Sequence, residues 1–266
     1  HCAAYDGFKG IHFKVTVDIE LSDWTEPIGI HNSFKGIFDG NHRSINNVAI
    51  NQSSHSCVGG LFGCASYGEI KNLTVRGSVI GNELVGGICG ASFAETLTNC
   101  HSYCELSCDE KKQIGGITGD DRGFTSFINC ENHGTITGGQ YSGGIIGRSH
   151  MGTIMDGCKN YGDITAKADN VGGICGSFAA TAGGGSINNC ENHGDIESTG
   201  KTKIGGIVGY IDDVKSNLVI SINGCINSGN ITSGKHTGGI IGHNKDTINI
   251  SNCLNIGKLL NGTENI

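Results

Sequence analysis

The sequence predicts an all-β fold, a parallel β-helix of about eight coils with an N-terminal cap, and two repeated tags carry this prediction. The first tag, Gly-Gly-apolar-x-Gly, occurs seven times in the 266 residues. Its first glycines stand at positions 59, 86, 115, 143, 172, 205 and 238, so successive copies are 27 to 33 residues apart. A period of this length is typical of a solenoid in which each repeat forms one turn.

The second tag, apolar-x-x-Cys-x-Asn-x-Gly-x-Ile, follows the same period. It is complete at 187–196 and recurs around Cys100, Cys130, Cys158, Cys225 and Cys253. Cys, Asn, Gly and Ile stand two residues apart, and polar or aromatic residues lie between them in the central copies. This alternation is typical of a strand with one buried face. Because the 46 glycines disfavour helix, we expect two or three short strands per coil, separated by Gly and Asn corners.

Residues 1–50 precede the first tag and are expected to form the cap and the coil that leads into the solenoid. Residues 51–266 are expected to form one continuous solenoid. In the first part, 13–21 alternates like a strand, and Trp24 and 27–29 are expected to turn the chain.

The two ends of the repeat region differ in character. Residues 44–50 already anticipate the second tag, so the solenoid is expected to begin before the first Gly-Gly pair. The last coil, around 252–257, shows no obvious cap. An uncovered coil exposes strand edges, so we expect the natural protein to continue beyond Ile266.

Composition excludes several classes of function. The net charge is −7 with 18 Lys and Arg residues, and no basic run is present, so nucleic acid is not an expected partner. No apolar run approaches the ~20 residues of a membrane helix, so this segment is not expected to insert into a membrane. The glycine tags lack the Lys-Ser/Thr of a phosphate-binding loop. We expect no cofactor.

The 13 cysteines are expected to be mainly buried free thiols. Their number is odd, and six of them recur at one repeat position, where stacked coils would form an internal row of small apolar side chains. Cys104 and Cys108 could form one local bridge, although packing is the favoured role. Free thiols in a secreted protein indicate a reducing or anaerobic habitat.

Gly60-Leu61-Phe62-Gly63 and its sister copies resemble the GLUG motif, and 34–50 resembles the segment that often precedes it. This resemblance covers nearly the whole chain. It implies a right-handed β-helix in a bacterial cell-surface or secreted protein of the adhesin-like kind. GLUG repeats also occur beside the catalytic domain of IgA1-specific metallopeptidases, but this chain has no His-Glu-x-x-His, so that activity is not carried over.

A row of planar side chains is the first candidate site. The third residue after the Cys position is Tyr103, His133, Tyr161 and His193 in four successive coils. With coils about 4.8 Å apart, this strip could stack against sugar rings of a host or dietary glycan or glycoprotein. Alternatively, neighbouring rings stack on each other and stabilise the solenoid. His133 and His193 lie two coils apart, too far for one zinc ion, so no metal site is expected.

Charged rows flank this strip. Glu131, Lys159 and Glu191, one residue after the Cys position, alternate in sign and are expected to form exposed pairs of little energetic weight. A second row of acids, five residues after the Cys position, consists of Glu105, Asp163 and Asp195. These acids could hold Ca²⁺, but no compact loop gathers enough oxygens.

The turns that follow the first tag are the second candidate site. Asp120, Asp121 and Arg122 are expected one coil away from Arg148 and His150. Acids, a cation and an imidazole on adjacent coils are what a β-helical polysaccharide lyase or hydrolase would need. Turns collect polar residues for other reasons, so plain surface polarity is the favoured interpretation.

The sequence therefore favours a non-enzymatic cell-surface or secreted module. It would bind carbohydrate or glycoprotein through the strip, or project a neighbouring domain. The alternatives are a polysaccharide-degrading enzyme and a purely structural spacer.

Overall fold

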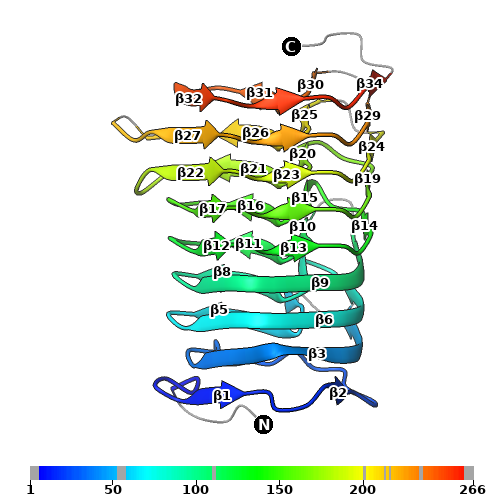
Figure 1. Cartoon of the computed structure of the whole chain (residues 1–266), viewed down its shortest axis with the longest axis vertical. Helices are drawn as coiled ribbons and strands as arrows, with labels where there is room; N and C mark the ends of the chain where they lie inside the picture. The colour runs from blue at the N-terminus through cyan, green and yellow to red at the C-terminus, as the bar shows by residue number, and fades with distance from the viewer. Residues whose placement is uncertain are drawn as a thin grey trace.

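The computed structural model describes residues 6–52, 58–109, 112–199, 202–212, 214–215, 217–233 and 236–260. Within these ranges the chain forms β-strands and turns without a helix, and neighbouring strands pair in parallel. The coils stack along one axis from the N-terminal to the C-terminal end (Figure 1). The predicted all-β parallel β-helix of about eight coils is confirmed.

Three parallel sheets make up the coils. One seven-stranded sheet consists of β4 (Val58–Gly59), β7 (Leu84–Gly86), β10 (Gln113–Gly115), β15 (Tyr141–Gly143), β20 (Val171–Gly172), β25 (Ile204–Gly205) and β30 (Thr237–Gly238). The other consists of β5 (Phe62–Ser66), β8 (Cys89–Phe93), β11 (Thr118–Asp121), β16 (Ile146–Ser149), β21 (Cys175–Ala179), β26 (Val208–Asp212) and β31 (Ile241–Asn244).

The third sheet has twenty strands: the first coil contributes two short strands, the next three coils contribute one long strand each, and the following coils contribute three short strands each. The long and N-terminal strands are β1 (His12–Lys14), β2 (Ile19–Glu20), β3 (Ile37–Gln52), β6 (Glu69–Gly81) and β9 (Thr96–Cys108). The short strands are β12 (Ser126–Ile128), β13 (Glu131–Asn132), β14 (Ile136–Thr137), β17 (Ile154–Asp156), β18 (Lys159–Asn160), β19 (Ile164–Ala166), β22 (Gly185–Asn188), β23 (Glu191–Asn192), β24 (Ile196–Ser198), β27 (Ile220–Asn223), β28 (Ile226–Asn227), β29 (Ile231–Thr232), β32 (Ile248–Ser251), β33 (Leu254–Asn255) and β34 (Leu259–Leu260).

The first tag forms the corner between the two seven-stranded sheets. In every copy the first glycine ends a strand of one sheet, and the fourth residue begins a strand of the other, as at Gly143 and Ile146. The apolar third residue, such as Ile145, is fully buried. The tag therefore turns the chain sharply while it feeds one aliphatic side chain per coil into the core.

The second tag supplies two inward rows of the core. Its cysteines from Cys100 to Cys225 are fully buried, and every described cysteine is a free thiol, including Cys104 and Cys108. Burial raises the pKa of thiols such as Cys130 and Cys158 well above the ordinary value, so these thiols are neutral. The expected row of buried thiols is present, and the local bridge is not formed.

The inward asparagines form a hydrogen-bonded ladder. The Nδ2 atoms of Asn132, Asn160, Asn192 and Asn227 each donate to the Oδ1 atom of the asparagine in the next coil, over 2.7 to 2.9 Å. Each of these Nδ2 atoms also donates to the carbonyl oxygen of the glycine two residues later, as from Asn160 to Gly162 at 2.9 Å. A buried amide costs free energy unless it is paired, and this ladder pairs it on both sides.

The predicted strand over 13–21 is interrupted in the structure. Its first part, β1, pairs with Ile37–Asp39, and its second part, β2, pairs with Ile45–Asn46. Between these two stretches β3 turns a corner at Asn41 and His42, both of which have positive φ. The cap strand follows that corner and therefore splits in two.

Candidate functional site

The strip of planar side chains forms one continuous stack, which we call the ring strip: Arg76, Tyr103, His133, Tyr161 and His193. The guanidinium carbon of Arg76 lies 3.9 Å from the centroid of the Tyr103 ring. Successive ring centroids from Tyr103 to His193 are then 4.2, 4.7 and 5.0 Å apart, with interplanar angles of 3°, 14° and 11°. The in-register coils place each ring directly over its neighbour.

This stacking decides what the ring strip can offer to a ligand. The faces of the inner rings are covered by their neighbours, and at one end the Nδ1 atom of His193 lies 2.8 Å from the Ser228 hydroxyl. Tyr103 and Tyr161 are 37% and 41% exposed, so the ring edges face solvent. The structure thus contains the stabilising stack that was the alternative to sugar stacking. Binding by these residues stays a prediction and would have to use edges and polar atoms.

Ion pairs and hydrogen bonds run beside the ring strip. The Nζ atom of Lys159 is 3.2 Å from Glu191, and the Nε2 atom of His193 is 2.9 Å from the other Glu191 oxygen. Partial burial opposes ionisation of Glu191, but its contacts with Lys159 and His193 outweigh this and lower its pKa. The flank is therefore charged and ordered.

A cluster that the sequence analysis missed lies two coils further toward the N-terminus. His101 of β9 pairs in register with Glu131 of β13, and the Nδ1 atom of His101 is 3.1 Å from Glu131 Oε2. The Nε2 atom of His133 is 2.9 Å from the same oxygen. The sequence contains a sign of this cluster, because His101 directly follows Cys100 just as Glu131 directly follows Cys130 in the next coil.

The second row of acids has a structural role at two positions. Asp163 accepts a hydrogen bond from the backbone N–H of Asp195 at 2.9 Å, and Asp195 accepts one from the backbone N–H of Asn230 at 2.7 Å. Each carboxylate therefore pairs with the next coil.

The turns predicted at the second candidate site are wrong, because Asp120 and Asp121 lie in β11 and Arg148 lies in β16, while Arg122 and His150 directly follow those strands. Asp120, Arg122 and His150 nevertheless meet on adjacent coils. Asp120 is 2% exposed, and its two oxygens contact Arg122 Nε at 2.8 Å and His150 Nε2 at 2.9 Å. Burial raises the pKa of Asp120, but the hydrogen bonds with His150 and Arg122 outweigh burial, and the net pKa is lowered. Arg148 lies in register with Asp120 and places its guanidinium carbon 4.9 Å from the centroid of the Tyr141 ring.

Asp121 points the other way, into the core. It contacts Thr153, Ser92 and the backbone N–H of Gly123, and it is fully buried. Burial raises its pKa. Asp120 and Asp121 thus have different surroundings, and both carboxyl groups are engaged by neighbouring side chains.

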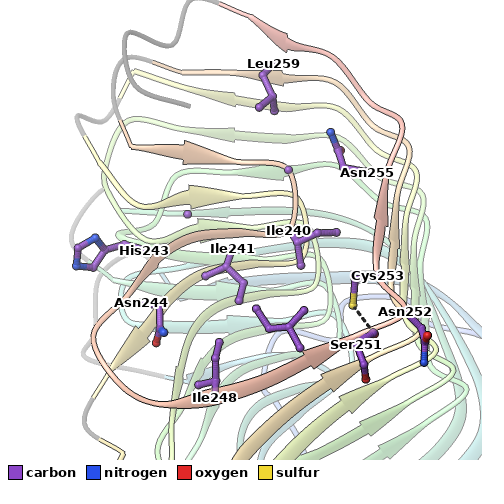
Figure 2. A pocket seen from close by; sticks show the side chains of 13 residues that line it. Ile240, Ile241, His243, Asn244, Ile248, Ser251, Asn252, Cys253, Asn255 and Leu259 are labelled. Carbon is purple, nitrogen blue, oxygen red and sulfur yellow. Dashed lines mark hydrogen bonds between the residues drawn. The ribbon is translucent and has the colours of Figure 1, made fainter. Parts of the chain in front are cut away.

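A hollow of about 950 Å³ opens at the C-terminal end of the described coils. Ile240, Ile241 and Ile248 line it, and Cys253 and Asn255 border it (Figure 2). These side chains continue the buried rows of the preceding coils. The hollow is therefore the end of the core column.

The geometry defines a parallel β-helical solenoid with an outer ladder of stacked polar rings. The family model of the GLUG motif matches residues 54–80, which include the first copy of the first tag. The predicted resemblance to GLUG repeats is confirmed for that segment. None of the described residues forms a helix long and apolar enough to cross a membrane.

Two known proteins are similar to this chain. It is 33% identical over 120 residues to halomucin from Haloquadratum walsbyi, which covers 41% of this chain and 1% of halomucin. Its fold is similar to that of a solved structure named "putative immunoglobulin A1 protease from Bacteroides ovatus", with a TM-score of 0.68. The match has 20% sequence identity and covers 92% of this chain and 78% of that chain. At this identity the likeness shows the fold.

Proposed function

We propose that this chain is a non-enzymatic module of a cell-surface or secreted protein, and that it binds a glycan or glycoprotein along the ring strip. The observation that carries the proposal is the continuous, half-exposed stack over successive coils. The GLUG match and the similarity to halomucin support a surface or secreted module.

The exposed edges of the ring strip suit a hydroxyl-rich polymer that lies along the solenoid axis. Each coil presents a phenol, an imidazole or a carboxylate at intervals of about 4.8 Å. The stacked rings lose little conformational freedom on binding because they are already ordered, which lowers the entropic cost of association. Tyrosine is suited to such wet contacts because its body is apolar and its hydroxyl group polar.

Affinity electrophoresis against a panel of plant, mucin and bacterial polysaccharides tests this proposal. We expect at least one polysaccharide to retard the chain, and we expect Tyr103→Phe and Tyr161→Phe to weaken the retardation. These changes remove the hydroxyl groups and keep the stack. Tyr67→Phe, at an exposed tyrosine outside the ring strip, is the matched control. The proposal is contradicted if no polysaccharide retards the chain. It is also contradicted if the retardation is unchanged in both Tyr103→Phe and Tyr161→Phe.

A polysaccharide lyase or hydrolase is the second candidate, and the contact between Asp120 and His150 favours it. A buried carboxylate that orients a half-exposed imidazole is one arrangement used in general base catalysis. The same polysaccharide mixtures are assayed for new reducing ends and unsaturated products. Products that Asp120→Asn abolishes would support this candidate, and their absence together with retardation would support the binding module.

A further inference from the structure

We propose that His101, Glu131 and His133 bind one zinc ion and thereby join β9 to the following coil. This inference goes beyond the proposed glycan binding, since two of the three residues lie outside the ring strip. It starts from the shared contact on Glu131 Oε2, which both imidazoles approach.

The positions of the donor atoms suit a single small cation. One nitrogen of each histidine and a carboxylate oxygen of Glu131 all lie within 4.8 Å of one another. Tetrahedral zinc with bonds of about 2.0 to 2.2 Å holds its ligand atoms about 3.3 Å apart. Both nitrogen-to-oxygen distances, 2.9 and 3.1 Å, are already close to that spacing. Binding therefore requires the two imidazole nitrogens, which lie within 4.8 Å of each other, to approach to about 3.3 Å.

The backbone and the ring strip hold these donors in place. The register pair His101 and Glu131 fixes two of them on adjacent strands. The His133 ring is held between the rings of Tyr103 and Tyr161, so it presents its edge to the carboxylate. Pre-positioned donors lose less conformational entropy when they bind an ion.

The donor set selects the class of metal. Two imidazoles and one carboxylate are ligands that zinc accepts in proteins, whereas Ca²⁺ and Mg²⁺ prefer oxygen ligands alone. The three side chains are 32%, 27% and 23% exposed, so the ion can enter and a water molecule can complete its coordination. The neutral cysteines of the core are fully buried and cannot contribute ligands here.

The chain carries its own matched control two coils away. Glu191 and His193 have the same contact, 2.9 Å between Nε2 and Oε2, as Glu131 and His133. The position that corresponds to His101 is Lys159, whose ammonium group pairs with Glu191 at 3.2 Å. An ammonium group cannot ligate zinc while it is protonated. The structure therefore assigns zinc to the first cluster and none to the second.

Isothermal titration of the whole chain with Zn²⁺ tests the assignment, and Co²⁺ absorption reports whether sulfur ligands take part. We expect one zinc ion per chain and no thiolate charge-transfer band. His101→Lys copies the sequence of the control cluster, retains a partner for Glu131, and is expected to weaken zinc binding at least tenfold. Lys159→His is expected to raise the stoichiometry to two. Unchanged thermal unfolding of both variants without metal shows that the coils are intact.

Three results would contradict the zinc assignment. No zinc binding by the unaltered chain, wild-type affinity in His101→Lys, or a thiolate band with Co²⁺ would each overturn the assignment. Glycan retardation is measured in parallel without metal, because loss of zinc binding in His101→Lys with retained retardation separates this site from the proposed glycan surface.

Discussion

Asn160 shows how one side chain joins three coils. It accepts a hydrogen bond from Asn132 in the coil before it, donates one to Asn192 in the coil after it, and donates another to the Gly162 carbonyl. All three are buried contacts. An alanine at this position would leave partners on both sides unsatisfied, so the cost extends beyond its own coil.

We expect Asn160→Ala to lower the free energy of unfolding by about 2 to 4 kcal/mol, because each buried polar group left without a partner costs about 1 to 3 kcal/mol. Chemical denaturation followed by circular dichroism measures the change. Asn249→Ala, at an exposed asparagine, should shift stability by less than about 0.5 kcal/mol. Equal effects of the two substitutions would contradict a role of the ladder in stability.

Glu95 should make stability depend on pH. It is 1% exposed and accepts a hydrogen bond from the backbone N–H of Gly68, and burial raises its pKa to about 8. In the unfolded chain a glutamate has a pKa near 4.3. Between these values the folded state holds a proton that the unfolded state has lost, so stability falls as pH rises.

The expected slope from Glu95 is up to about 1.4 kcal/mol per pH unit between roughly pH 5 and 8. Glu95→Gln cannot ionise and should remove this part of the pH dependence. Denaturation midpoints of both proteins at pH 5, 6, 7 and 8 provide the test. The stability of the variant relative to the unaltered chain should rise with pH, and parallel profiles would show that Glu95 is ionised in the fold.

At the scale of residues, the sequence predicted the inward rows that recur from coil to coil and missed Glu95 and the His101 cluster. The inward Cys and Asn rows follow from the period-2 pattern. Glu95 has no counterpart in the neighbouring coils, where the equivalent corner positions hold Gly68 and Thr125. The His101 cluster joins residues 30 positions apart, and its recognition requires the register as well as the composition.

At the scale of the elements, the asparagine ladder limits which residues can occupy the Gly-Gly corner. A Cβ atom on Gly144 would overlap the Gly173 carbonyl oxygen and the Asn160 carboxamide. The second glycines of four other copies, Gly116, Gly173, Gly206 and Gly239, face the inward asparagines in the same way. The second glycine of the first tag packs against the asparagine of the second tag, so the two tags recur together.

Gly144→Ala is expected to destabilise the solenoid by about 3 kcal/mol, the upper end of the usual cost of overpacking. A thermal unfolding series gives the readout. Gly123→Ala is the control, because its added methyl group would first meet side-chain atoms of Phe93 at 3.2 Å, which can yield. A small effect of Gly144→Ala would show that the corner can open without disturbing the ladder.

The same steric limit explains which elements the sequence predicted well. The tags mark corners because a Cβ atom does not fit at their second glycine, but the residues after each tag, expected in turns, continue as strands such as β11 and β16. The strand expected over 13–21 was broken because its partner β3 bends at Asn41 and His42, a tertiary constraint that alternation alone does not contain.

For the whole molecule, each coil depends chiefly on its two neighbours, as in other solenoids. In the part of the chain that the structure describes, β17–β19 pair with coils on both sides, whereas β32–β34 pair only with β27–β29. Exposed apolar side chains at Ile250 and Leu254 mark that end.

Amide hydrogen exchange should therefore be graded along the axis. We expect the slowest exchange in β17–β19 and the fastest exchange of strand amides in β32–β34, because local opening requires fewer contacts to break there. Mass spectrometry of peptides from both regions gives the comparison. Equal protection of the two coils would indicate that the solenoid opens as one cooperative unit.

The coils differ in length without losing register. The step between first glycines grows from 29 to 33 residues after Gly172, yet β21 still pairs with β16 and β22 with β17. The extra length falls partly in the link between β21 and β22, which runs from Ala180 to Gly184 and projects from the stack (Figure 1). Such a link can vary in length and chemistry while the tags preserve the stack. The core and the surface of this solenoid can therefore change separately. A longer link at one corner can acquire a new binding specificity while the strand pairing of the coils stays the same.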